Sequence, residues 1–275
     1  MIRSLFPSAA DWNRCWANFR RLLARPESAQ GGRCLGCGGP VGGAMRDSRT
    51  SDRLPAASSG SAMPGLCADC YAAIPWIAHV ACRICGRATP CPDCLRNATR
   101  YFLCSRSAVQ YTPLMKDWLR MYKFRGHEKM APLFGHMLMH GYRLLAAEMR
   151  KRRGIPAAVT FVPASAERAR ERGFNQSEQL AQYLGRATGL PVLPLLIRVR
   201  HGGRQSTKSR RDRLKDLRGA FEKLPGANMP AFPDRRPPAI ILVDDVYTTG
   251  STLNECARIL REQLGAAVFG LTWAR

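Results

Sequence analysis

The chain is short of acidic residues and of long apolar runs. Its 275 residues include 20 Asp and Glu against 43 Lys and Arg, which gives a formal net charge of +23. No apolar run approaches the ~20 residues that a membrane helix needs, so we expect no membrane span. Residues 1–10 lack the apolar core and cleavage site of a signal peptide. These absences predict a cytoplasmic protein.

The surplus of positive charge favours partners that carry many negative charges. Nucleic acids, phosphorylated ligands and anionic membrane surfaces all meet this description. A general preference for Arg in the proteome of origin gives the same surplus, so charge alone supports a nucleic-acid partner only moderately. The length suits one large domain and a second, smaller one.

Eight of the 11 cysteines form four Cys-x-x-Cys pairs. In a reducing compartment such pairs indicate metal binding rather than disulfides, and no thioredoxin-like strand precedes any of them. Four thiolates in a tetrahedron form a structural Zn²⁺ site, so we expect one or two zinc ions. Grouping the first two pairs and the last two pairs is our interpretation, and interleaved pairing fits the spacing as well. The expected ligands are Cys34, Cys37, Cys67, Cys70, Cys82, Cys85, Cys91 and Cys94.

From about Tyr101 the apolar pattern predicts alternating strands and helices. This alternation is typical of an α/β protein with a mostly parallel sheet flanked by helices. We expect helices that begin at Thr112-Pro113 and that cover residues 130–151 and 176–188, with a further short basic helix at 11–25. The expected strands cover residues 157–163, 192–199, 240–243 and 266–273. Residues 201–217 form a basic segment.

The most informative stretch reads IILVDDVYTTGSTL over residues 240–253. It predicts a buried strand that ends in Asp244 and Asp245, a hydroxyl-rich turn with Gly250, and a helix. Ligands of open α/β sheets bind where a strand ends and a helix begins. Free N–H groups at a helix start suit a phosphate, and carboxylates suit sugar hydroxyls, directly or through Mg²⁺. The stretch therefore has groups for both ends of a ribose 5-phosphate.

A second stretch, VPASAERARERGFNQ, covers residues 162–176. A turn that ends at Ser165 and is followed by arginines can offer N–H groups and guanidinium groups to a diphosphate. An exposed charged loop with a helix cap explains this stretch equally well. A helix then begins at Asn175 or Gln176.

Residues 243–252 closely resemble the 5-phosphoribosyl-1-pyrophosphate (PRPP) loop of type I phosphoribosyltransferases. Together with the cysteine pairs, KFRG at 123–126 and VPAS…RGFNQ at 162–176, in this order, the chain resembles the ComF family of competence-associated proteins. The resemblance covers nearly the whole chain from Cys34. It implies a basic extension at 1–33, a double zinc ribbon at 34–98 and a type I phosphoribosyltransferase-like domain at 99–275.

The resemblance also implies roles for single residues. Asp244 and Asp245 would hold the ribose hydroxyls of PRPP, with Mg²⁺ bound beside the diphosphate. Asp216 stands where the family usually has Asn, three residues after Arg213. The expected 5′-phosphate site comprises Tyr247, Thr248, Thr249, Gly250, Ser251 and Thr252. The expected diphosphate side comprises Lys123, Ser165, Arg168, Arg172 and Arg213.

Three functions follow as hypotheses. The first is a ComF-like protein of DNA uptake that binds PRPP or a related ligand and single-stranded DNA, with an uptake helicase or other competence proteins as partners. The second is a phosphoribosyltransferase of nucleobase or nucleotide salvage. The third is a non-catalytic zinc-ribbon adaptor. The residues identify no base for an acceptor, so the acceptor and turnover itself stay open.

Overall fold

The computed structural model describes residues 32–41, 63, 65–92, 94, 99–123, 130–152, 154–199, 219–229 and 237–275. The predicted helix at 11–25 and the basic segment at 201–217, with Arg213, lie outside these residues. No helix in the described ranges is long and apolar enough to cross a membrane.

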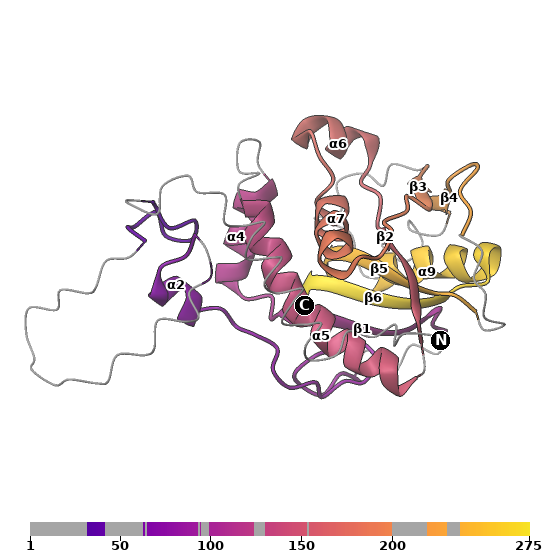
Figure 1. Ribbon diagram of the computed structural model, residues 1–275, viewed down its shortest axis with the longest axis horizontal. Coiled ribbons are helices and arrows are strands. Elements are labelled where there is room, and N and C mark those ends of the chain that lie inside the picture. The colour runs from indigo at the N-terminus through magenta and orange to yellow at the C-terminus, as the bar shows by residue number, and fades with distance from the viewer. Residues whose placement is uncertain are drawn as a thin grey trace, which may run out of the picture.

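A four-stranded parallel sheet forms the centre of the α/β part (Figure 1). The predicted strands at 157–163, 240–243 and 266–273 are confirmed, whereas the edge strand β1 was not predicted. The spatial order is β1 (Phe102–Val109), β6 (Ala267–Ala274), β5 (Ala239–Val246) and β2 (Pro156–Phe161).

Both faces of the sheet are covered, which explains the unbroken apolar run of β5. Side chains of a strand alternate between the two faces. Ile241 and Val243 join a core with α4 (Pro113–Lys123), α5 (Ala131–Lys151) and α7 (Gln176–Thr188). Ile240 and Leu242 join a second core with α9 (Ser251–Leu264). The predicted helices that lie in the described residues are therefore confirmed, and α5, α7 and α9 pack on the strands of the sheet.

Two predictions on the segments between β2 and β5 need correction. Of the predicted strand at 192–199, Val192 forms an isolated parallel bridge to Val159 of β2. Only the later part forms a strand, β3 (Leu196–Arg198), and it pairs antiparallel with β4 (Phe221–Lys223), outside the main sheet. Pro194 has no N–H to donate, so it interrupts the earlier part of that run. The charged stretch after β2 forms a short helix, α6 (Ala166–Arg172), rather than a loop.

Candidate functional site

Strands β2 and β5 are parallel neighbours, so their carboxyl ends meet at one edge of the sheet. The N–H of Val162 donates to the carbonyl of Val243 over 3.0 Å, which keeps the chains together one residue beyond β2. The turn to Ser165 therefore starts beside Asp244 and Asp245, as the predicted site requires.

Asp244 and Asp245 have different partners. The Asp244 carboxylate accepts hydrogen bonds from the Ser177 hydroxyl (3.1 Å) and from the Asp245 N–H (2.8 Å). Asp245 Oδ2 lies 2.5 Å from Nζ of Lys123, the last residue of α4. Lys123, expected on the diphosphate side, therefore lies against one of the two carboxylates.

These contacts separate the proton affinities of the two carboxyls. Burial, and then the negative charge of Asp245, raise the pKa of Asp244 to about 7. Burial also disfavours the ionised form of Asp245, but the Lys123 ammonium outweighs it and holds that pKa below its ordinary value. At neutral pH the pair therefore has one ionised carboxylate, that of Asp245, and one that is partly protonated, that of Asp244.

The start of α9 has no side-chain cap from its N-cap residue, and the Ser251 N–H makes a long hydrogen bond of 3.4 Å to the Thr249 hydroxyl. Its N-cap residue is Gly250, with a φ of +79°, and the Thr249 hydroxyl bonds the Ser251 hydroxyl over 2.7 Å. A Cβ atom on Gly250 would clash with the Tyr247 hydroxyl. Glycine is thus required here, and the uncapped N–H groups and hydroxyls suit an anion.

A cavity of about 110 Å³ adjoins this helix start. Thr249, Gly250 and Ser251 line it from the turn, and Arg100 lines it from the segment after the cysteine pairs. Asn254 holds that segment in place, since its side chain accepts from the Tyr101 N–H (2.9 Å) and donates to the Thr99 carbonyl (3.3 Å). The expected phosphate position therefore borders a guanidinium group.

Arginines gather near the carboxylates from two elements. Ser165 caps α6 by accepting from the Arg168 N–H over 3.3 Å, and Arg172 donates to Gln176 over 3.0 Å. Burial and the charge of Arg168 lower the pKa of Arg172, while Asp245 opposes this shift. Burial and Arg168 likewise lower the pKa of Arg198 of β3, against the effect of Asp244. Clustered cations of this kind are stabilised by a bound anion.

The cysteines form two tetrads, as the consecutive grouping predicted. The sulfur atoms of each tetrad lie within 4.8 Å of one another. Cys37 Sγ and Cys67 Sγ are 3.8 Å apart, the edge of ~3.8 Å that a tetrahedron with Zn–S bonds of ~2.3 Å requires. Each tetrad could therefore hold a zinc ion. The first comprises Cys34, Cys37, Cys67 and Cys70, and the second comprises Cys82, Cys85, Cys91 and Cys94.

The second tetrad contacts the turn after β5. Arg275 Nη2 lies 3.6 Å from Cys91 Sγ, and the same guanidinium lies 4.3 Å above the Tyr247 ring. The Tyr247 ring also meets Phe102 edge to face at 6.3 Å. A four-thiolate zinc site carries negative charge, which the Arg275 guanidinium would balance. The predicted phosphate turn thus rests on the metal-binding part of the chain.

Not every predicted residue lies in this arrangement. Thr248 is exposed, Thr252 lies in the first turn of α9, and Arg213 lies outside the described residues. Ser177, Arg100 and Arg198 belong to the site but were not among the predicted residues. The sequence held a signal for Ser177, because this residue directly follows Asn175 and Gln176, where the helix was predicted to begin.

The fold and the site define a class of protein. It is an α/β protein whose parallel sheet ends in an acidic pair before a glycine-capped helix, and to which two cysteine tetrads are attached.

Three relatives then identify the family, although no protein-family model matches the chain. Competence protein F of Haemophilus influenzae is 30% identical over 204 residues, 72% of this chain and 85% of that protein. Competence protein ComFC of Bacillus subtilis is 30% identical over 214 residues, 74% and 80% of the two chains. DNA utilization protein YhgH of Escherichia coli K12 is 30% identical over 228 residues, 75% and 95% of the two. The chain belongs to the ComF family.

A solved structure of the allosteric regulatory enzyme of purine biosynthesis is 23% identical, with a TM-score of 0.29. The match covers 50% of this chain and 24% of that one.

Proposed function

We propose that this protein acts in DNA uptake in the cytoplasm, where it binds PRPP or a related phosphoribosyl ligand and associates with single-stranded DNA. The names of its relatives, which are competence and DNA utilization proteins, support the process. The observation that carries the ligand is the Asp244–Asp245 pair at the end of β5, followed by the uncapped start of α9.

In this proposal the two ends of the ligand occupy different parts of one edge. Asp244 and Asp245 accept hydrogen bonds from the ribose hydroxyls, and the N–H groups and hydroxyls of Thr249, Gly250 and Ser251 hold the 5′-phosphate. Arg168 and Arg172 of α6 face the diphosphate. Carboxylate and phosphate oxygens are the ligands that Mg²⁺ prefers, so the ion would neutralise the diphosphate when bound.

The cysteine tetrads belong to the same proposal. Each would hold one structural Zn²⁺, closed by four thiolates, within a ribbon at 34–98 beside the phosphoribosyltransferase-like domain at 99–275. Transfer of the ribosyl group would in addition need an acceptor, so the proposal concerns binding first.

Calorimetric titration of PRPP with Mg²⁺, with and without a short single-stranded DNA, tests the proposal. We expect micromolar PRPP binding to the wild type. The double variant Asp244→Asn, Asp245→Asn keeps the shape of both side chains, and it should lose that binding while its circular dichroism spectrum stays unchanged. Unchanged PRPP affinity in this variant would refute the ribose role of the pair.

The remaining outcomes separate the other functions. Tight DNA binding without PRPP binding would indicate a nucleic-acid-binding protein without a phosphoribosyl site. PRPP binding without DNA binding would favour the salvage enzyme, and binding of neither would favour the zinc-ribbon adaptor.

A further inference from the structure

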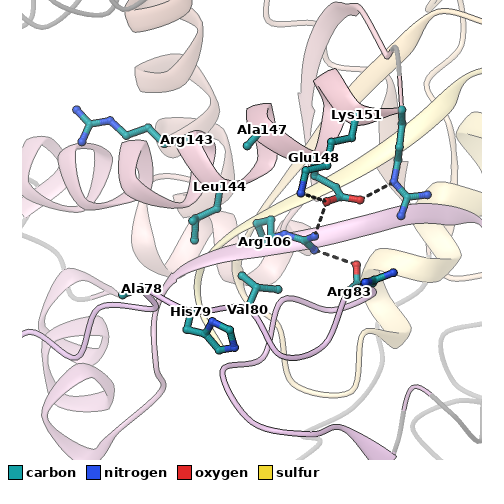
Figure 2. Close-up of a pocket in the computed structure, with 11 residues that line it drawn as sticks. Ala78, His79, Val80, Arg83, Arg106, Arg143, Leu144, Ala147, Glu148 and Lys151 are labelled. Carbon is teal, nitrogen blue, oxygen red and sulfur yellow. Dashed lines mark hydrogen bonds and ion pairs between the residues drawn. The ribbon is translucent and has the colours of Figure 1, made fainter.

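A second cavity, of about 610 Å³, lies away from the carboxylates, and it shares no lining residue with the site described above. Three elements enclose it: the segment 78–83 at the start of the second tetrad, the edge strand β1, and the C-terminal half of α5. Figure 2 shows Arg106 of β1 between Glu148 of α5 and the backbone of Arg83.

The lining is strongly basic. It includes five cationic side chains and one carboxylate, that of Glu148. The cations are Arg83, Arg106, Arg143, Lys151 and Arg152.

Glu148 organises three of these cations. Its carboxylate meets Arg106 at 3.3 Å, Arg152 at 2.9 Å and Lys151 at 4.0 Å. Arg106 is nearly buried, with 4% of its side chain exposed, and it also donates to the carbonyls of Arg83 and Ser105. The floor of the cavity is therefore a fixed guanidinium, while Arg83 and Lys151 are exposed at the rim. An anion would relieve the repulsion among the cations.

The size and the apolar part of the lining restrict the anion. Ligand cavities commonly measure ~300–1,000 Å³, and this one is far larger than a lone phosphate ion requires. Ala78, Val80, Leu144 and Ala147 line it between the charges. Such a surface suits the less polar sugar or base of a nucleotide, with its phosphate on the arginines.

We propose that this cavity binds the phosphate groups of nucleotides, as a free nucleotide or as a unit of a single-stranded DNA backbone. In the second form the inference rests on the DNA association proposed above. DNA bound in this cavity would leave the Asp244–Asp245 edge of the sheet free for the phosphoribosyl ligand.

The test compares two charge-reversed pairs by fluorescence anisotropy with a labelled twelve-residue oligothymidylate and by calorimetry with thymidine monophosphate. The cavity pair is Arg83→Glu, Lys151→Glu. The control pair is Arg33→Glu, Arg186→Glu, which places the same charge change beside the first tetrad and in the last turn of α7, outside the cavity. All four side chains are exposed, so both variants should fold, which thermal melting verifies.

For the strand we expect a loss of affinity of at least about tenfold in the cavity pair and less than about threefold in the control, with a weaker salt dependence in the cavity pair. A selective loss of thymidine monophosphate binding alone would assign the cavity to free nucleotides. Equal effects of the two pairs on both ligands would overturn the inference. If the wild type binds no strand, the DNA association fails, and the nucleotide titration still decides on the cavity.

Discussion

Asp244 and Asp245 adjoin in the sequence but differ in what surrounds them. Burial raises the pKa of Asp244 from 3.8 to about 7. Below pH ~4 Asp244 is protonated in both the folded and the unfolded chain, so its burial costs no stability. As the pH rises from ~4 through 7, the folded state is progressively destabilised relative to the unfolded state. Asp244→Asn keeps an acceptor for Ser177 and removes this loss. We expect the variant to exceed the wild type by about 2 kcal/mol above pH 7, and by progressively less toward pH 4, in urea unfolding at several pH values.

The control for this prediction is Asp117→Asn, which changes an exposed carboxylate of α4. Its stability relative to the wild type should vary little over the same range. If the stability advantage of Asp244→Asn over the wild type does not grow with pH, burial does not raise the pKa of Asp244 and the prediction is wrong.

Lys123 supports the other carboxyl group, since its ammonium meets Asp245 with 28% and 20% of the two side chains exposed. The pKa of Asp245 is held below its ordinary value, so this contribution to stability is present above pH ~4 and is lost at lower pH. Lys123→Met leaves two adjacent carboxyls without this cation. We expect a loss of about 2 kcal/mol at pH 8 that is still present at pH 5 and shrinks only below pH ~4, measured by thermal melting.

Lys116→Met is the matched control, because Lys116 is an exposed lysine of the same helix. It should change stability by less than about 0.5 kcal/mol. Equal losses in the two variants would show that the Lys123–Asp245 pair adds no stability.

At the scale of elements, the start of α9 depends on Gly250. Its φ is +79°, and a Cβ atom would meet the Tyr247 hydroxyl. Gly189, which ends α7, has a φ of +74° with nothing near its Cβ position. Gly250→Ala and Gly189→Ala therefore share the backbone cost of about 1 kcal/mol, and only the first adds a clash. We expect Gly250→Ala to lose at least about 1 kcal/mol more stability than Gly189→Ala in denaturant unfolding. Gly250→Ala should also bind PRPP more weakly in calorimetry, whereas Gly189→Ala should not.

The sequence allowed β5, its turn and α9 to be predicted because every local signal there agrees. Strand β1 could not be predicted in this way, since its interior is polar. Ser107 bonds Thr272 over 2.6 Å and Arg106 pairs with Glu148. These partners lie on other elements, so only the assembled sheet shows why polar residues are buried there.

The same limit applies to the site. The acidic pair and the glycine turn are contiguous and could be proposed from their order alone. Ser177 and Arg100 reach the site only through the packing of α7 and through the bonds of Asn254 to residues 99–101. The pairing of the cysteines was likewise open in the spacing, and the folded chain decides it.

At the scale of the whole molecule, the two tetrads have different neighbours. Gly36, within the first tetrad, packs closely on Trp118 of α4. The second tetrad shares a core with Tyr247, Leu253 and Phe102, which lie around the phosphate turn. We therefore expect the second zinc ion to stabilise the ligand site and the first to stabilise mainly its own ribbon.

The substitutions Cys37→Ser and Cys91→Ser test this difference. Each should reduce the zinc content from two ions to one per chain, as measured by a colorimetric chelator assay. Cys91→Ser also weakens the support that Arg275 gives to the Tyr247 ring. We expect it to reduce PRPP affinity about tenfold, while Cys37→Ser changes it less than about threefold and both variants keep the helical circular dichroism of the α/β part. Equal affinity losses in the two variants would mean that the second tetrad gives the phosphate turn no particular support.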